Sequence, residues 1–160
     1  MATSTKSVRI KDILTRDVVA VGPEDSLYEA LTLMAENRVS ALPVVNGKGQ
    51  CVGIISSTDI LSFTRELTEE LDEYPMFESS HQWLLDQLEE HDLGRRSVHE
   101  VMTPDVITVG PEATLVEAAQ TMLSNRVHRL PVVDDKGRLL GVVSTTDLLA
   151  AFVRQAEDEK

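Results

Sequence analysis

The chain is short of cysteine, of basic residues and of long apolar runs, and each shortage excludes a class of protein. The single cysteine, Cys51, cannot form a disulfide within the chain, which favours a reducing compartment. Because 15 basic residues face 27 acidic ones, the net charge is −12, and the basic surface that nucleic acids and anionic membranes require is lacking. No apolar run approaches the roughly 18 residues of a membrane-spanning helix, and residues 1–7 lack the apolar stretch of a secretory signal. We therefore expect a cytoplasmic protein that binds neither nucleic acid nor membrane.

Groups that carry catalysis or bind metals are also sparse. The four histidines show no ligand spacing and no second cysteine accompanies them, so we expect no metal site. Neither a Gly-x-Ser-x-Gly motif nor a phosphate-binding loop occurs. Cys51 lies in an apolar stretch, which predicts a buried small side chain rather than a nucleophile. We assign no catalytic residue, and only turnover of an added nucleotide would argue for an enzyme.

What the chain does contain is an internal repeat with a constant offset of 88 positions. Roughly half of the aligned positions between residues 10–61 and 98–149 are identical without a gap, which chance does not produce. The clearest matches are Gly22-Pro23-Glu24 with Gly110-Pro111-Glu112, Leu42-Pro43-Val44-Val45 with Leu130-Pro131-Val132-Val133, Ser56 with Ser144, and Asp59 with Asp147. The chain is therefore predicted to be a tandem duplication.

The repeat boundaries divide the chain into five parts. Residues 8–61 form the first repeat and residues 98–153 the second, with a flexible N-terminus at 1–7, an acidic insert at 62–97 and a charged tail at 154–160. The insert is predicted to hold a helix that is capped by Ser80 and ends near Gly94, with a narrow apolar stripe of Trp83, Leu84 and Leu88. Two interpretations of the insert stay open: a docking or dimerisation arm, and a helical cover packed on its own domain.

Each repeat is predicted to follow the order β-α-β-β-α. A β-branched run that ends in Gly-Pro predicts a strand at residues 18–21 and again at 106–109. Ser26 and Thr114 each stand three positions before a glutamate, which predicts a helix capping box. Apolar residues then follow at helical spacing, and the proline within each Leu-Pro-Val-Val segment predicts an edge strand or a position at the start of a strand.

These elements predict a fold of the α/β (α+β) class. A single unit of about 50 residues buries too little apolar surface to be stable alone. We therefore expect the two repeats to pack sheet to sheet about a pseudo-twofold axis. Such packing would leave two related clefts where the repeats meet, and clefts of this kind are common ligand sites.

This pattern resembles a tandem pair of cystathionine-β-synthase (CBS) domains, also called a Bateman module. The resemblance rests on the segment VMTPDV at 101–106, on the paired Leu-Pro-Val-Val segments, and on the closing segments GIISSTD at 53–59 and GVVSTTD at 141–147. It covers residues 8–62 and 97–153 and leaves the insert and the termini unmatched. The resemblance implies a regulatory module without catalysis and without an obligatory cofactor. It would bind an adenosine-containing small molecule (AMP, ADP or ATP) in the clefts between the repeats.

The resemblance also assigns roles to the two Ser-x-x-Asp motifs. The serine would approach a phosphate and the aspartate would hold the ribose hydroxyls. A carboxylate can accept both hydrogen bonds of a vicinal diol, and the free N–H groups at a helix N-terminus favour phosphate. The same spacing is an ordinary capping box, and the two roles can coexist.

By the geometry of the family, each cleft would mix residues of both repeats. One site would combine Ser144 and Asp147 with Gly22, Pro23, Val39, Ser40 and Ala41. The other would combine Ser56 and Asp59 with Gly110, Pro111, Val127, His128 and Arg129. Apolar residues near Val18 and Val106 would flank adenine. Because Arg129 adds charge-assisted hydrogen bonds, we expect the Asp59 site to prefer the more highly charged phosphate, although a surface ion pair is an alternative role for this arginine.

Members of the family commonly dimerise, so a homodimer is expected, with a separate protein target that the sequence does not identify. The alternative function is a homodimerisation scaffold with unoccupied clefts. Two intact Ser-x-x-Asp motifs count against that alternative.

Overall fold

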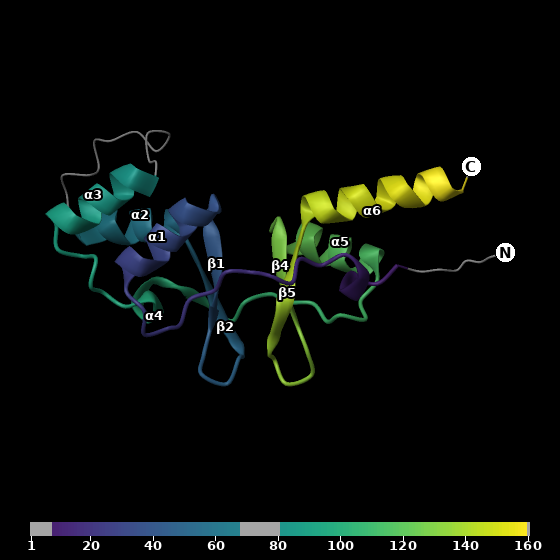
Figure 1. The fold of residues 1–160 in the computed structure, drawn as a ribbon, viewed down its shortest axis with the longest axis horizontal. Helices are drawn as coiled ribbons and strands as arrows, with labels where there is room; N and C mark the ends of the chain where they lie inside the picture. The colour runs from purple at the N-terminus through teal and green to yellow at the C-terminus, as the bar shows by residue number, and fades with distance from the viewer. Residues whose placement is uncertain (1–7, 68–80, 160) are drawn as a thin grey trace. The chain divides into compact units, whose positions relative to one another are not determined.

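The computed structural model describes residues 8–67 and 81–159, which form two compact units (Figure 1). Unit 1 contains the chain up to Val18, Gly49–Cys51 and the chain from Ile107 onward. Unit 2 contains Val19–Lys48 and Val52–Val106. Each unit therefore consists of the main part of one sequence repeat together with the opening segment of the other repeat.

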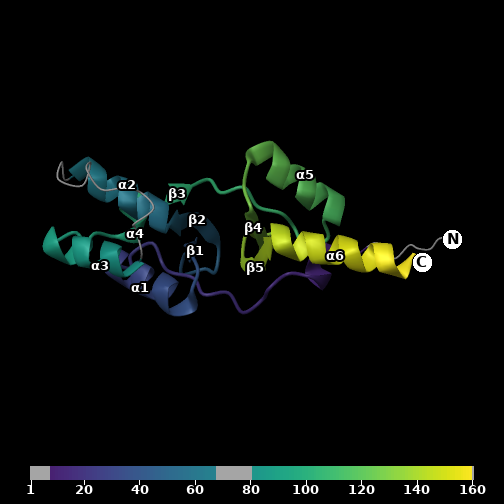
Figure 2. The same cartoon turned by 90° about the horizontal axis from the view of Figure 1, so that it is seen from above.

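Unit 2 is a three-stranded sheet with helices on one face. Its elements are α1 (Leu27–Asn37), β1 (Ala41–Val45), β2 (Cys51–Ser56), α2 (Ser57–Leu67), α3 (His81–Glu90), α4 (Val98–Val101) and β3 (Thr103–Pro104). The strand order is β1-β2-β3, and β3 runs antiparallel to β2 with Ile54 opposite Thr103. Figures 1 and 2 show α1 and α3 side by side on the same face of β1 and β2 as α2. Strand β1 lies at an edge, as its proline predicted.

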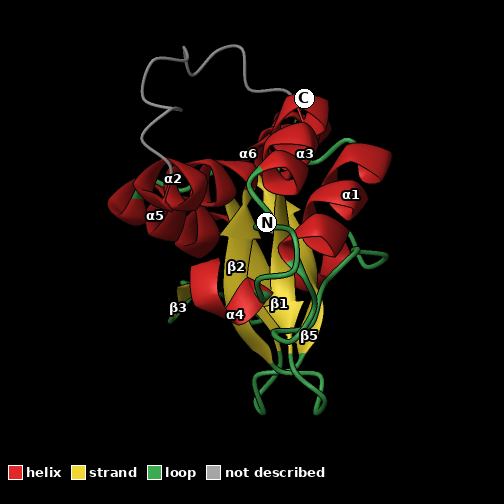
Figure 3. Ribbon diagram, turned by 90° about the vertical axis from the view of Figure 1, so that its left-hand side faces the viewer, coloured by secondary structure: helices red, strands yellow, loops and turns green. Residues whose placement is uncertain are grey.

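Unit 1 repeats this plan with two strands. Its elements are η1 (Ile10–Asp12), α5 (Leu115–Asn125), β4 (Arg129–Val133), β5 (Leu139–Ser144) and α6 (Thr145–Asp158). Strands β4 and β5 are antiparallel with Arg129 opposite Ser144, and α5 packs against α6. The mixed α/β class is confirmed by the order of helices and strands along the chain, and Figure 3 shows the strands in yellow and the helices in red. Helix α6 runs through part of the predicted charged tail.

The helix starts follow the predicted capping chemistry. The Ser26 Oγ accepts a hydrogen bond from the Glu29 N–H at 3.1 Å. At the equivalent place in the second repeat, the Thr114 Oγ1 accepts from the Glu117 N–H at 3.0 Å, and the Glu117 carboxylate accepts from the Thr114 N–H. These side chains satisfy N–H groups that have no partner within the helix.

The predicted opening strands at residues 18–21 and 106–109 are wrong. Of each run, only the last residue pairs, since Val21 and Val109 form isolated parallel bridges to β1 and β4. The reason is that the chain passes from one unit to the other between Val18 and Val19, and again after Val106. Residues at the two ends of one run belong to different units and cannot share a neighbouring strand.

The exchanged opening segments are held by backbone hydrogen bonds. In unit 1, the Ile10 N–H donates to the Ala113 carbonyl at 2.9 Å, and Thr15 and Val142 exchange two hydrogen bonds at 2.9 and 3.0 Å. In unit 2, the Val98 N–H donates to the Asp25 carbonyl at 2.8 Å. Ile10 and Val98 are fully buried, so each exchanged segment also contributes to the apolar core of its unit.

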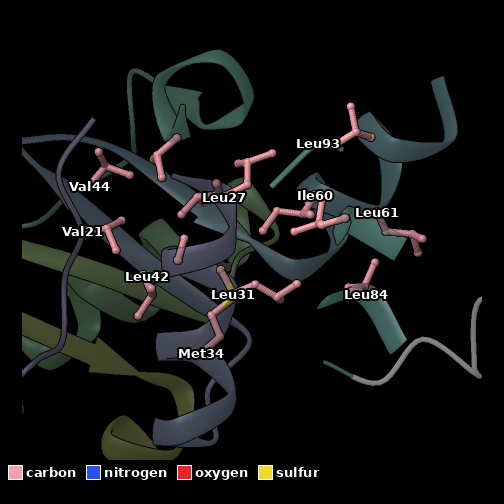
Figure 4. Packing of buried hydrophobic residues seen from close by; sticks show 14 residues of the cluster. Val21, Leu27, Leu31, Met34, Leu42, Val44, Ile60, Leu61, Leu84 and Leu93 are labelled. Atoms are coloured by element: carbon pink, nitrogen blue, oxygen red, sulfur yellow. The ribbon is translucent and has the colours of Figure 1, made fainter. Parts of the chain in front are cut away.

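Helix α3 of the insert is part of the core of unit 2. Leu84 and Leu88 are buried against α1 and α2, and Figure 4 shows Leu84 close to Leu31 and Leu61. Of the two interpretations of the insert, the structure therefore shows the helical cover packed on its own unit. Buried apolar side chains at helical spacing give an otherwise short helix its stability.

The predicted end of α3 at Gly94 is wrong, because the helix stops at Glu90. The Leu93 N–H donates to the Leu88 carbonyl at 2.8 Å, and the Asp92 N–H donates to the Glu89 carbonyl at 3.2 Å. Asp92 adopts a left-handed conformation with φ 55°, which completes a Schellman motif. The buried contact of Leu93 sets the end of the helix, and the predicted cap Ser80 lies outside the described residues.

Candidate functional site

The first Ser-x-x-Asp motif lies where β2 passes into α2. Ser56 is the last residue of β2, and Asp59 stands in the first turn of α2. The Ser56 N–H donates to Asp59 Oδ2 at 2.9 Å, and the Asp59 N–H donates to Ser56 Oγ at 3.0 Å. This is the reciprocal cap that a hydroxyl and a carboxylate at this spacing can form.

The second motif has the same geometry between β5 and α6. The Ser144 N–H donates to Asp147 Oδ2 at 2.8 Å, and the Asp147 N–H donates to Ser144 Oγ at 3.1 Å. Among the described residues, no hydrogen-bond partner occupies the other carboxylate oxygen, Oδ1, of either aspartate. Both aspartates are half-buried. Each can therefore cap its helix and still accept hydrogen bonds from a ligand.

A main-chain contact places a second predicted segment beside each motif. In unit 2, the Ser57 N–H donates to the Ser40 carbonyl at 2.9 Å. In unit 1, the Thr145 N–H and Oγ1 donate to the His128 carbonyl at 2.9 and 3.1 Å. The sequence analysis did not single out Ser57 and Thr145. Their equivalent positions in the two repeats were a signal that they make the same main-chain contact.

The left-handed residues that end α1 and α5 set the direction in which the chain continues into residues 39–41 and 127–129. Arg38 and Arg126 both have φ 54° and close their helices, so that the chain turns directly into β1 and β4. As a result Val39, Ser40 and Ala41 approach the Asp59 motif in unit 2. The equivalent residues Val127, His128 and Arg129 approach the Asp147 motif in unit 1.

The two Gly-Pro turns follow the bridges to β1 and β4. The Val21 N–H donates to the Pro43 carbonyl at 3.1 Å, and the Val109 N–H donates to the Pro131 carbonyl at 3.1 Å. The carbonyls of Pro23 and Pro111 accept hydrogen bonds from the exchanged segments. The Gly22 N–H donates to Asp25 Oδ2 at 2.8 Å, whereas Ala113 replaces that aspartate after Gly110.

The exchange of segments places each of the two valines that were predicted to flank adenine in one unit with one of the motifs. Val18 lies in unit 1 together with Ser144 and Asp147, and Val106 lies in unit 2 together with Ser56 and Asp59. Both valines are half-buried. No repeat pattern could have supplied this assignment, because the exchange leaves no mark in the sequence.

None of the predicted site residues is buried. Ser40, Gly110, His128 and Arg129 are exposed, and the other twelve are half-buried. Within residues 8–67 and 81–159, none of the ion pairs involves Arg129. All sixteen residues are therefore at least partly exposed to solvent.

The described part of the chain was also searched for metal sites and for membrane-spanning helices. No group of three or more His, Cys, Asp or Glu side chains lies close enough there to hold a metal ion. No described helix combines the length and the apolar character needed to cross a membrane.

Comparisons with known proteins agree with the repeat. Residues 10–66 and 98–154 each match the CBS domain. The uncharacterised protein MJ1426 of Methanocaldococcus jannaschii is 36% identical in an alignment that covers 90% of this chain and 90% of its own. An inosine-5′-monophosphate dehydrogenase of the same organism is 29% identical over 93% of this chain, but the match spans only 25% of that enzyme.

A solved structure shares the fold over nearly the whole chain. The CBS-pair protein CBSX2 from Arabidopsis thaliana has a TM-score of 0.75 and 27% identity, covering 95% of this chain and 99% of its own. CBSX2 has also been solved in complex with AMP, and that structure matches with a TM-score of 0.69 and 27% identity over 92% of this chain and 98% of its own.

Proposed function

The chain belongs to the CBS domain family, and on this premise we propose that it is a regulatory, ligand-sensing module that binds AMP, ADP or ATP and catalyses no reaction of its own. The observation that carries the proposal is the pair of equivalent Ser-x-x-Asp motifs, each with one carboxylate oxygen committed to a helix cap and the other open. The complex of CBSX2 with AMP supports an adenine nucleotide as the ligand.

In this proposal, Asp59 and Asp147 accept hydrogen bonds from the ribose hydroxyls. Ser56 and Ser144 stand at the starts of α2 and α6, where the serine hydroxyl can donate to a phosphate and the positive end of the helix dipole favours it. Val106 and Val18 flank adenine beside their respective motifs. The inclusion of Gly22, Pro23 and residues 39–41 with Asp147, and of Gly110, Pro111 and residues 127–129 with Asp59, rests on the family resemblance alone.

A thermal-shift panel tests the proposal, with AMP, ADP, ATP, NAD and S-adenosylmethionine added to the full chain. A ligand that binds only the folded state, at a hundredfold excess over its Kd, stabilises the fold by about 2.7 kcal/mol. We expect an adenine nucleotide to raise the melting temperature. The double variant Asp59→Asn/Asp147→Asn should respond much less, because each asparagine lacks the charge of the carboxylate. Its amide oxygen can still accept the hydrogen bond from the serine N–H, so the helix cap is kept.

Glu117→Gln is the matched control. It removes a carboxylate from a capping box of the same kind that lies outside the proposed site. The nucleotide response of this variant should equal that of the parent chain. If the double aspartate variant also responds like the parent, these residues are not the nucleotide ligands.

A homodimerisation scaffold is the second candidate. The observation in its favour is the exposure of large apolar side chains on α5 and α6, where Leu123 is 79% and Leu149 is 60% exposed. No response to any member of the panel, together with a dimer in sedimentation velocity, would favour this candidate over nucleotide sensing.

A further inference from the structure

The turn that joins β1 to β2 contains an Asn-Gly pair, Asn46-Gly47 (Figure 1). This pair suits tight hairpin turns. It is also the pair in which the backbone nitrogen of the second residue most readily attacks the side-chain amide of the first, because glycine has no side chain to block the approach. Of the three asparagines in the chain, only Asn46 precedes a glycine.

The nitrogen that would attack is open to solvent. Gly47 is exposed, and among the described residues its N–H donates no hydrogen bond. A Cβ built on Gly47 would meet no atom within 4 Å, so the space beside this nitrogen is open as well. Water can therefore reach the Gly47 N–H and take its proton, which is the first step of an attack.

The carbonyl that would be attacked is polarised by the same turn. Asn46 Oδ1 accepts a hydrogen bond from the Lys48 N–H at 2.9 Å. Such a donor stabilises the negative charge that collects on Oδ1 when a nitrogen adds to Cγ. Because the nucleophile and the carbonyl belong to neighbouring residues of one ordered turn, the reaction needs no encounter between molecules.

The other two asparagines, Asn37 and Asn125, lack these features. Each lies at the end of a helix, and its Nδ2 donates to a backbone carbonyl one turn earlier at 2.8 Å. The residues that follow are Arg38 and Arg126, whose N–H groups donate to carbonyls in the last turns of α1 and α5. The chain therefore contains two internal controls, in which both the leaving amide and the attacking nitrogen are held by the helix.

The second repeat shows what the turn looks like with an aspartate in place of the asparagine. Asp134 occupies the repeat position of Asn46. Its Oδ1 accepts from the Lys136 N–H at 2.9 Å, as Asn46 Oδ1 does from the Lys48 N–H. The glycine that follows in each turn has nearly the same conformation, with φ 82° and 81°. This hairpin geometry thus accommodates either side chain.

We propose that Asn46 is a site of spontaneous deamidation in the folded protein, and that the aspartyl product keeps the native hairpin. The Gly47 nitrogen loses its proton to water and bonds to Asn46 Cγ, the Cγ–Nδ2 bond breaks, and ammonia leaves. Water then opens the cyclic imide. Cleavage of the new bond to Cγ gives aspartate, whereas cleavage of the original peptide bond gives isoaspartate, in which the main chain runs through the former side chain. The proposal does not depend on nucleotide binding.

The test incubates the folded full chain at mildly alkaline pH and analyses tryptic peptides by mass spectrometry over time. Cleavage after Arg38 and Lys48 releases peptide 39–48, which contains Asn46. We expect this peptide to acquire the mass of a hydroxyl in place of an amino group and to separate chromatographically into aspartyl and isoaspartyl forms. Asn37 and Asn125 should stay unchanged. A sample taken at time zero corrects for conversion during digestion.

Gly47→Ala is the matched variant. Its Cβ meets no neighbouring atom and the backbone there lies outside the left-handed region, so the turn is kept. The added methyl group hinders the approach of the nitrogen to Cγ, and we expect conversion to slow at least about tenfold, which corresponds to about 1.4 kcal/mol in the activation free energy. Equal rates in the parent chain and in Gly47→Ala would overturn the proposal, because the Gly47 nitrogen would not be the nucleophile.

Two further measurements complete the test. An unchanged peptide 39–48 in the folded chain would overturn the proposal, and conversion only in urea would show that the hairpin protects Asn46. The variant Asn46→Asp reproduces the aspartyl product and should melt at the temperature of the parent chain. A clear loss of stability in Asn46→Asp would contradict the claim that this product keeps the native hairpin.

Discussion

Asp59 and Asp147 illustrate how one side chain can serve the fold and a ligand at once. The cap holds Oδ2 of each carboxylate on the serine N–H at 2.9 and 2.8 Å, which also fixes the direction of Oδ1. A carboxylate that is oriented before the ligand arrives loses little conformational freedom on binding. The proposed ligand contact therefore uses an orientation that the helix cap already provides.

A different aspartate makes the stability of the fold sensitive to pH. Asp134, in the β4–β5 turn, accepts hydrogen bonds from the Arg138 N–H at 2.9 Å and the Arg138 Nε at 2.8 Å. The backbone N–H of Arg138, followed by its guanidinium and the N–H of Lys136, lowers the pKa of Asp134. A group with a lowered pKa stabilises the fold above its ordinary pKa in the unfolded chain, and this contribution disappears as the pH falls through the folded value.

The variant Asp134→Asn tests this effect, because the amide still accepts the backbone hydrogen bonds but carries no charge. We expect the parent chain to be more stable than the variant at neutral pH. The difference should shrink as the pH falls below the ordinary range of an aspartate. Urea unfolding over a series of pH values measures it, and a difference that grows toward acid pH would contradict the role assigned to the charge.

At the scale of elements, each unit is completed by a segment that comes from the other repeat, and unit 2 also by a helix of the insert. The opening segment of each repeat completes the unit built mainly by the other repeat, and α3 completes the helical layer of unit 2. Gly53 and Gly141 stand inside β2 and β5 at equivalent positions, where the exchanged segments approach most closely. A Cβ at Gly53 would lie 2.8 Å from Met102 Sδ and 2.8 Å from the Thr103 carbonyl oxygen. A glycine within a strand commonly marks such a close approach of another part of the backbone.

We therefore expect Gly53→Ala to destabilise the fold by about 1–3 kcal/mol, the usual range for overpacking. The matched control is Gly110→Ala, because a Cβ there would meet no atom within 4 Å and the backbone lies outside the left-handed region. Urea unfolding of both variants compares the free energies of unfolding. Equal stability of the two variants would mean that β2 and the exchanged segment can separate without cost.

For the molecule as a whole, the duplication produces two similar motifs in unequal settings. Ala41 of unit 2 stands at the repeat position of Arg129 in unit 1, and Ser40 stands at that of His128. Helix α3 covers one pair of helices while the equivalent pair stays open. The two halves have thus diverged at the proposed nucleotide contacts, so their ligand preferences should differ, and they have also diverged in the cover of their helices.

The variant Arg129→Ala measures this divergence at the nucleotide sites. Because a guanidinium forms charge-assisted hydrogen bonds with phosphates, we expect the variant to lose more affinity for ATP than for AMP in isothermal titration calorimetry. Arg138→Ala removes another cation from unit 1, one that is paired with Asp134, and should leave both affinities unchanged. Unchanged affinities in Arg129→Ala would exclude a role for this residue in phosphate recognition.

The sequence by itself determined the repeat, its helices and hairpins, the two capping motifs and the family, because each depends on residues close together in the chain. Ser56 and Asp59 stand three positions apart, and the capping contact between them follows from that spacing. The apolar stripe of α3 could likewise be read from its spacing, although the end of that helix depended on the burial of Leu93.

Only the tertiary structure decided which segments complete which unit. The exchange that joins Val18 to the unit of Asp147, and Val106 to that of Asp59, is set by long-range backbone hydrogen bonds such as that from Ile10 to Ala113. The tertiary structure also decided that α3 packs on α1 and α2 and not on the equivalent helices α5 and α6. Two repeats with the same pattern of motifs offer similar local signals. The choice between them was therefore made by packing between parts of the chain that are distant in sequence.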